Sequence, residues 1–265
     1  MMGIQLALEM VDGGVVGYPL VILLASALSL FPPGEGPGPD PDAVQLDQRV
    51  ALERGDHGPL VEHLQVRLGI AGFRPGDVDG EYGRATYQAV LAFEKYHELE
   101  RNGVFEPAEW ELLDVAPTVR LRSERSRIEI DLDKQVLYLV KDNAVDAVVG
   151  ISSGNGATFT NYTGRQVTAR TPEGEFSFYL ERNYNHRSYL GTMYKPFYFY
   201  GGYAIHGSPS VPGYPASHGC VRVTNDDMDF LRTELELGMS VYLYGNRTEN
   251  PPGITIPVAL GVSPA

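Results

Sequence analysis

The segment PASHGCVRVT contains Cys220, the only cysteine of the 265-residue chain. A cysteine attacks as the thiolate, so a catalytic cysteine needs a base to lower the cost of losing its proton. His206 and His218 are both candidate bases. Gly219 permits backbone angles that expose the N–H groups of the turn to an oxyanion, and Arg222 adds a positive charge nearby. On residue types alone Cys220 is a candidate nucleophile, and the alternative is a small buried apolar residue without chemistry.

The composition is that of an acidic globular protein. With 265 residues and 43% apolar content, the chain can bury a core and is long enough for one large domain or two modest ones. The net charge of −13 argues against nucleic acid and anionic membrane surfaces as partners, because both favour clusters of Lys and Arg. A single cysteine also excludes an internal disulfide.

Residues 1–47 are expected to lie outside the folded domains. Val15–Phe31 is a run without a charged residue, of a length suited to a signal peptide or a membrane anchor. No Lys or Arg precedes the run, unlike in an ordinary signal peptide, and a buried core helix is the alternative. The stretch PPGEGPGPDPD that follows has the composition of an extended linker.

Residues 48–115 are predicted to form a small bundle of three helices. In LVEHLQVRL the residues Leu60, Leu64 and Leu68 recur at helical spacing, which gives one apolar face. After the loop RPGDVDGEYG, the stretch RATYQAVLAFEKYHEL carries a second such face. Pro107 begins a third short helix, which contains Trp110.

This region resembles the peptidoglycan-binding domain of bacterial cell-wall enzymes. The resemblance rests on the LQ pair, the pattern PGxxDGxxGxxT, the AVxxF of AVLAF, and the late Gly-Val and Trp. Glu94 stands where the family usually has Gln, and Glu106 where it often has Gly. The resemblance implies binding to the wall, and the alternative is a three-helix spacer. His57, His63 and His97 lack further Cys or His at ligand spacing, so no metal site is predicted.

After a charged linker at 116–126, the hydrophobic period changes from that of a helix to that of a strand. RIEIDLDKQVLYLV is predicted to be a β-hairpin around its DLDKQ turn, with AVDAVVGIS as a third strand. Residues 127–245 are therefore expected to form a β-rich domain of mixed, sandwich-like sheets, with one helix at DDMDFLRTEL. Residues 246–265 form a C-terminal tail to which no role is assigned.

The motifs TPEGEF, IHG and SHGCVR follow one another in the β-rich region, and in this order they are similar to those of the L,D-transpeptidases of bacterial cell walls. The resemblance implies that Cys220 is the nucleophile and that His206, rather than the nearer His218, is the base. It also implies that the N–H groups of His218, Gly219 and Cys220 form the oxyanion hole. Arg222 replaces the Asn of many members, as a supporting residue that orders the loop or meets a substrate carboxylate.

The segment FSFYLERNYNHRSYLGTMYKPFYFYGGY is rich in aromatic residues. Four of them alternate as in buried strands and are assigned to the core, namely Phe176, Phe178, Phe197 and Phe199. Tyr184, Tyr189 and Tyr194 lie in the less regular middle, where two interpretations stay open: a lid that grips a stem peptide over the thiol, or a plain surface loop. Gly207 and Ser217, next to the base and the nucleophile, are also expected to contact the substrate.

The resemblance implies an exported enzyme of cell-wall biogenesis and cell shape, which cross-links peptidoglycan stem peptides through a Cys220 thioester and releases D-alanine. Two alternatives stay open: an L,D-carboxypeptidase, in which water resolves the thioester, and a non-catalytic wall-binding protein. The expected partners are tetrapeptide stems and glycan, with carbapenems as inhibitors. No cofactor, metal or nucleic acid is expected, and the protein is expected to be secreted or held by one membrane anchor.

Overall fold

The computed structural model describes residues 50–119 and 122–245, all of which belong to one compact unit. The expected signal peptide or anchor at Val15–Phe31 and the tail at 246–265 lie outside the described residues. Within the described ranges, no helix is both long enough and apolar enough to cross a membrane.

The N-terminal part of this unit contains two α-helices, α1 (Pro59–Ile70) and α2 (Arg84–His97), and one 3-10 helix, η1 (Pro107–Asp114). A proline stands in the first turn of both α1 and η1, where its missing N–H has no intrahelical acceptor to lose. A capping box between Glu106 and Glu109 further defines the start of η1. This helical region therefore has two α-helices rather than three, and its third helical segment is a 3-10 helix.

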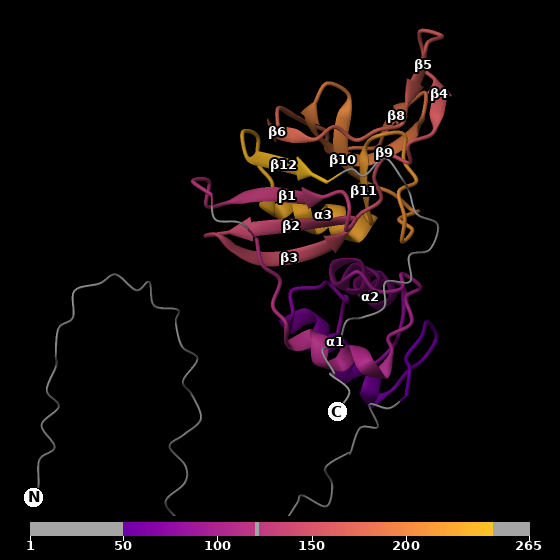
Figure 1. Ribbon diagram of the computed structural model, residues 1–265, viewed down its shortest axis with the longest axis vertical. Coiled ribbons are helices and arrows are strands. Elements are labelled where there is room, and N and C mark those ends of the chain that lie inside the picture. Colours follow the sequence, from indigo (N-terminus) through magenta and orange to yellow (C-terminus); the bar gives the residue numbers. More distant parts are fainter. Residues whose placement is uncertain (1–49, 120–121, 246–265) are drawn as a thin grey trace, which may run out of the picture. The chain divides into compact units, whose positions relative to one another are not determined.

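Two β-sheets form most of the remaining fold (Figure 1). The first has the order β3-β2-β1-β12-β6, and its strands are β1 (Arg127–Asp131), β2 (Val136–Lys141), β3 (Ala144–Gly150), β6 (Gly174–Ser177) and β12 (Ser240–Tyr244). The second has the order β11-β10-β9-β7, and its strands are β7 (Leu180–Glu181), β9 (Gly191–Tyr200), β10 (Tyr203–Gly207) and β11 (Val221–Val223). Both sheets are mixed, because β1 pairs with β12 in parallel and β10 pairs with β11 in parallel.

Three further strands and one helix complete the β-rich region. β8 (His186–Ser188) pairs with β9 outside the main path of the second sheet. β4 (Thr158–Thr160) and β5 (Gln166–Thr168) pair only with each other, as a hairpin. The helix α3 (Asn225–Glu234) begins after Thr224, whose side chain accepts a hydrogen bond from the Asp227 amide, and it packs against β9 and β10.

The first sheet is buried on both faces. Along β2, Val136, Tyr138 and Val140 contact a cluster formed mainly by the helical region, whereas Leu137 and Leu139 contact a second cluster between the two sheets. The helical region thus covers the outer face of this sheet, with α2 beside β3 (Figure 1). This double burial explains why VLYLV is a continuous apolar run rather than an alternating one.

The cluster between the sheets contains the aromatic residues that the sequence assigned to the core. Phe178, Phe197 and Phe199 are at most 3% exposed, and Phe176 is partly buried against them. Rings meet edge-on or tilted across the cluster, with 5.3 Å between the centres of Phe178 and Phe197. The core prediction for these four residues is confirmed.

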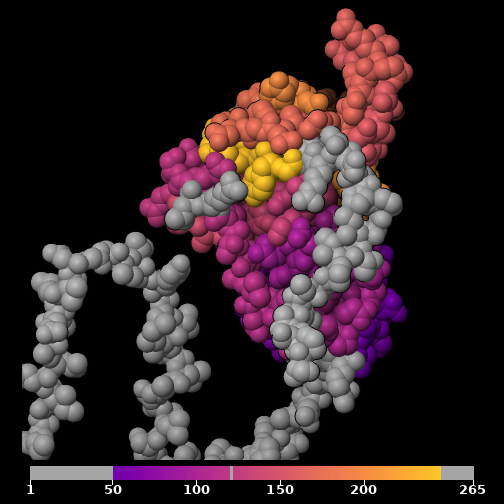
Figure 2. Space-filling model, in the orientation of Figure 1, coloured from indigo at the N-terminus to yellow at the C-terminus, as the bar shows by residue number. Residues whose placement is uncertain are grey.

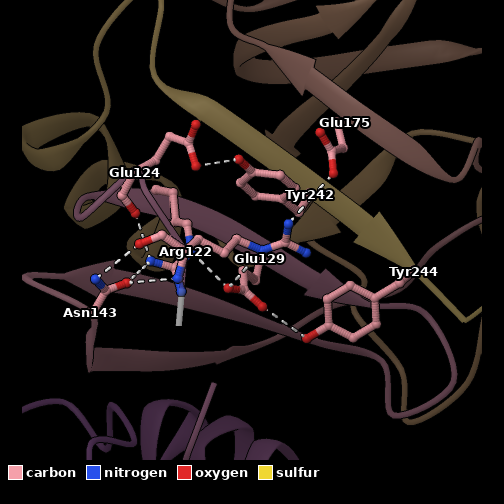
Figure 3. A network of polar contacts seen from close by, with 8 residues as sticks. Arg122, Glu124, Glu129, Asn143, Glu175, Tyr242 and Tyr244 are labelled. Carbon is pink, nitrogen blue, oxygen red and sulfur yellow. Dashed lines mark hydrogen bonds and ion pairs between the residues drawn. The ribbon is translucent and has the colours of Figure 1, made fainter. Parts of the chain in front are cut away.

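The chain enters the β-rich region through a network of charged and polar side chains (Figure 3). Arg127 and Glu129, both on β1, are at most 1% exposed and form an ion pair with 2.7 Å between Nε and Oε1. Arg127 also donates to the Asn143 side chain, and the Arg122 guanidinium lies 3.7 Å from the centre of the Tyr242 ring. These contacts fix the segment before β1 to the sheet. The buried charges among them need partners that offset the cost of their desolvation.

Candidate active site

Cys220 and His206 come together because β10 and β11 are neighbouring parallel strands. Ile205 lies opposite Val221 in this pair, and His206 lies opposite Arg222. Ile205 and Val221 point into the core between the sheets. Since successive side chains of a strand alternate between faces, His206, Cys220 and Arg222 share the other face. The register therefore puts both predicted catalytic side chains and Arg222 on one side of the second sheet.

His206 is buried, and one of its ring nitrogens has a fixed partner. Nδ1 lies 2.9 Å from the carbonyl oxygen of Gly207, which can only accept, so the neutral ring carries its proton on Nδ1 and keeps Nε2 as the basic nitrogen. Burial, and secondarily the charge of Arg222, lower the pKa of His206 to about 4 against the opposing effect of the Gly207 bond. The imidazole is therefore neutral at neutral pH and able to accept a proton.

The Cys220 thiol is half-buried, and its Sγ lies 3.8 Å from the carbonyl oxygen of Gly202. Burial raises the pKa of the thiol, while the backbone of Ala204 and the charge of Arg222 act in the opposite direction. The resting site is thus a neutral thiol on the same face as a neutral imidazole. In such a site thiolate formation accompanies proton transfer to the base rather than preceding it.

The turn before Cys220 is held by side-chain hydrogen bonds. Ser217 Oγ accepts from the Gly219 amide at 2.9 Å and donates to the Cys220 carbonyl at 2.6 Å. Thr171 Oγ1 donates to the Gly219 carbonyl at 2.7 Å. Gly219 has a φ of +132°, and a Cβ there would lie 2.7 Å from the ring of Tyr203. The glycine of SHGC is therefore required both by the backbone angle and by the space.

The amide of Gly219, an expected oxyanion donor, already donates to Ser217. The amides of His218 and Cys220 have no protein acceptor in the described part of the chain, so these two are the donors that the turn leaves open. Ser217, expected to contact the substrate, is 2% exposed and braces the turn instead. Gly207 likewise positions His206 through its carbonyl.

The segment after β3 forms a support under the turn. The amide and carbonyl of Ser152 pair with the carbonyl and amide of Arg222, at 2.9 and 3.0 Å. The carbonyl of Ser153 accepts from the amides of Ala216 and Ser217, at 3.0 and 2.9 Å. Both ends of SHGCVR are thereby tied to one extended segment, which keeps the Cys220 backbone in place.

Two tyrosines beside the thiol were not predicted from the sequence. Tyr198 lies opposite Ala204 on the thiol face of the sheet, and its hydroxyl forms a hydrogen bond with Nδ1 of His186. The ring of Tyr203 packs against Gly219. Burial raises the pKa of both tyrosines, and Cys220 contributes to each shift. The sequence does contain a signal for Tyr198. In FYFY on β9 the phenylalanines enter the core, so the tyrosines that alternate with them take the other face of the sheet.

The three tyrosines considered for a lid have different environments. Tyr194 donates to the Asp229 carboxylate of α3 at 2.9 Å and packs on the core cluster, opposite the thiol face, so the structure does not bring it to Cys220. Tyr184 and Tyr189 are more than half exposed. The ring of Tyr189 lies 5.7 Å from that of Tyr162, in the turn of the β4–β5 hairpin.

His218 is exposed and contacts the same hairpin. Its ring packs edge-on against Phe159 of β4, with 4.9 Å between ring centres. The hairpin projects as an arm from the rest of the described chain (Figure 2). His218 therefore joins the SHGC turn to this arm through its ring contact with Phe159.

Two protein-family models and several solved structures match this chain. The model for the L,D-transpeptidase catalytic domain matches residues 125–243, and that for a putative peptidoglycan binding domain matches residues 57–113. The crystal structure of an L,D-transpeptidase from Xylanimonas cellulosilytica DSM 15894 is 44% identical, with a TM-score of 0.70, over 79% of this chain and 100% of that chain. One from Stackebrandtia nassauensis is 19% identical, with a TM-score of 0.44, over 74% of this chain and 96% of that chain. No curated protein matches the sequence.

Proposed function

The chain belongs to the L,D-transpeptidase family, and we propose on this basis that it cross-links peptidoglycan stem peptides through a thioester on Cys220. The observation that carries the proposal is the register of β10 and β11, which gives His206, Cys220 and Arg222 a common face. The acyl donor is a tetrapeptide stem that ends in D-alanine, and the acceptor is an amine of a neighbouring stem.

In the first half-reaction the Cys220 sulfur attacks the carbonyl carbon that precedes the terminal D-alanine, while the thiol proton passes to Nε2 of His206. The amides of His218 and Cys220 donate to the oxygen that becomes negative, and the charge of Arg222 favours the same anion. When the C–N bond breaks, His206 returns the proton to the leaving amine. D-Alanine departs, and the stem remains on Cys220 as a thioester.

In the second half-reaction the acceptor amine attacks the thioester carbonyl and gives a proton to His206. The Cys220 thiolate leaves, recovers the proton, and the new amide bond is the cross-link. Tyr184 and Tyr189, both more than half exposed, are the residues we propose to cover the acyl-enzyme and limit the access of water, and Tyr189 also contacts the β4–β5 hairpin.

The helical region is proposed to hold the enzyme on peptidoglycan. It carries a surface cavity of about 660 Å³ with apolar and polar lining residues, among them Leu52, Asp56, His57, Leu60 and Val104. Because peptidoglycan lies outside the cytoplasm, this function places the protein there, either secreted or held by the N-terminal apolar run.

Product analysis tests the proposed reaction against its two alternatives. The purified protein is incubated with disaccharide tetrapeptide, and the products are separated and weighed by mass spectrometry. Cross-linked dimers with stoichiometric D-alanine are expected, and they must be absent with Cys220→Ala. Tripeptide and D-alanine without dimers would instead identify an L,D-carboxypeptidase. Unchanged substrate with a folded protein would leave only a wall-binding function.

A further inference from the structure

The segment that connects His206 to Cys220, here called the connection, forms few hydrogen bonds within itself. It reads SPSVPGYPA over residues 208–216, and three of its residues are proline, at positions 209, 212 and 215. Proline has no N–H to donate, so this segment has fewer backbone donors for its own carbonyls than an ordinary loop; the Ser210 carbonyl is bonded within the segment, by Ser208 Oγ at 3.1 Å. Four other carbonyls of the segment accept from donors outside it, and these donors set the course of the chain from His206 to Cys220.

Three cations of the helical region supply the missing donors. Lys95 Nζ donates to the carbonyl of Pro212 at 3.1 Å, and Arg101 donates to that of Gly213 at 3.1 Å. Arg84, at the start of α2, donates to the carbonyl of Pro209 at 3.1 Å. Ser152, under the SHGC turn, donates to the next carbonyl, that of Tyr214, at 2.9 Å. The connection is thus clamped between the helical region and the support of the active site.

Lys95 holds both sides of this clamp. Besides Pro212, its Nζ donates at 2.8 Å to the carbonyl of Ile151. Ile151 directly precedes Ser152 and Ser153, whose backbone groups bind Arg222 and Ser217. One ammonium group therefore joins the connection before Cys220 to the segment that supports Cys220, across two parts of the chain that are far apart in sequence.

Burying the Lys95 ammonium group has a desolvation cost, which its hydrogen bonds to the two carbonyls must offset. Its side chain is fully buried, it makes no ion pair within the described ranges, and burial lowers its pKa to about 7. A methionine of similar length would fill the same space without the cost of desolvating a charge. Methionine would, however, leave the carbonyls of Ile151 and Pro212 without this donor, so the lysine is favoured by the two segments that it joins.

We propose that Lys95, assisted by Arg101 and Arg84, is a positioning residue of the acyl-transfer site, which makes the helical region part of the catalytic machinery and not only a wall anchor. The proposal rests on the proposed function, because it assigns Lys95 to the placement of Cys220 relative to His206. It predicts that loosening the clamp slows the chemical step even though no residue in contact with the substrate is changed.

The test compares Lys95→Met with Lys134→Met. Lys134 is a matched control, because its Nζ also joins the two regions through a carbonyl, that of Tyr96, at 2.9 Å, yet it does not touch the connection. The maximal rate of acylation by a carbapenem, kinact, is measured together with KI by intact mass spectrometry of the full chain. Hydrogen exchange is followed in peptides that cover residues 208–219.

Lys95→Met is expected to lower kinact by roughly 10-fold to 10²-fold with little change in KI, and to speed exchange in residues 208–219. Lys134→Met is expected to change neither. Equal behaviour of the two variants in both measurements would overturn the proposal. If the wild type is never acylated, the proposed function fails, but hydrogen exchange still decides whether Lys95 holds the connection.

Gly213→Ala is a second variant that leaves the buried lysine in place. A Cβ at residue 213 would lie 2.9 Å from Cβ of Arg101 and would push the connection off the helical region. The same loss of kinact and faster exchange are expected. Wild-type values for Gly213→Ala would contradict the clamp, and this variant decides the matter if Lys95→Met does not fold.

Discussion

The pH dependence of acylation tests the role of His206, because its environment shifts the pKa far from that of an ordinary histidine. Burial lowers the pKa of His206 from 6.5 to about 4, and burial raises that of the Cys220 thiol. The active form has a neutral imidazole and a neutral thiol. Acylation should therefore fall only as the pH drops through about 4, and no rise from free thiolate is expected near neutral pH.

The two possible pKa values of His206 give very different rates in mild acid. At pH 5 a group with a pKa of about 4 is about 90% neutral, whereas a group at about 6.5 is about 3% neutral. The acylation rate at pH 5 should thus be close to that at pH 7, and about 30-fold higher than an ordinary histidine base would allow. His206→Ala should lower the rate at pH 7 by about 10²-fold to 10⁴-fold. The residual acylation rate of His206→Ala should rise about tenfold per pH unit, because hydroxide then forms the thiolate.

The assay is the second-order rate constant of carbapenem acylation between pH 4 and 9, followed by intact mass for the wild type and for histidine variants. His186→Ala is the control, because His186 bonds to Tyr198 and not to the Gly207 carbonyl that orients the base. A wild-type midpoint near pH 6.5 would refute the argument from burial. A near-normal rate for His206→Ala with a large loss for His218→Ala would show that the base is assigned to the wrong histidine.

Three further predictions concern the structure around the site. Gly219→Ala should slow acylation at least about 10²-fold, since the φ of +132° and a Cβ only 2.7 Å from the Tyr203 ring force the turn to move; carbapenem kinetics will show it. Glu94→Gln should raise stability at pH 8 but not at pH 4. Burial raises the pKa of Glu94 from 4.5 to about 9, so ionisation between these values favours the unfolded chain by up to about 1.4 kcal/mol per pH unit, as thermal unfolding at both pH values will measure. Arg127→Met should cost about 3–5 kcal/mol in urea unfolding, because Glu129 then stays buried with only longer contacts, 3.6 Å to Arg122 and 3.3 Å to the Tyr244 hydroxyl. An unfolding free energy equal to that of the wild type would contradict this.

The local elements of the fold could be predicted from the sequence because their signals are local. Periodic apolar residues define α1 and α2, and the DLDKQ turn between two apolar runs defines the pairing of β1 with β2. The parallel pairs of β1 with β12 and of β10 with β11 carry no such signal, since their partners are joined by long connections. The burial of β2 on both faces likewise depends on the packing of the helical region, which no single segment specifies.

For the site, the sequence identified the residue types and the structure supplied their geometry. SHGC and IHG were recognisable as motifs, but only the strand register explains why His206 and Cys220 share a face. Ser217 and Gly207 have backbone and side-chain bonds within the site that leave them as supports rather than substrate contacts. Lys95 lies in an ordinary helical stretch, and its bonds to Ile151 and Pro212 exist only in the folded chain.

The most direct test of the central claim, that Cys220 is an activated nucleophile, is the intact mass of the folded protein after incubation with a carbapenem. A single covalent adduct that maps to the peptide containing Cys220, and that is absent from Cys220→Ala, is the predicted result. An unmodified thiol after prolonged incubation, with folding verified by circular dichroism, would contradict it.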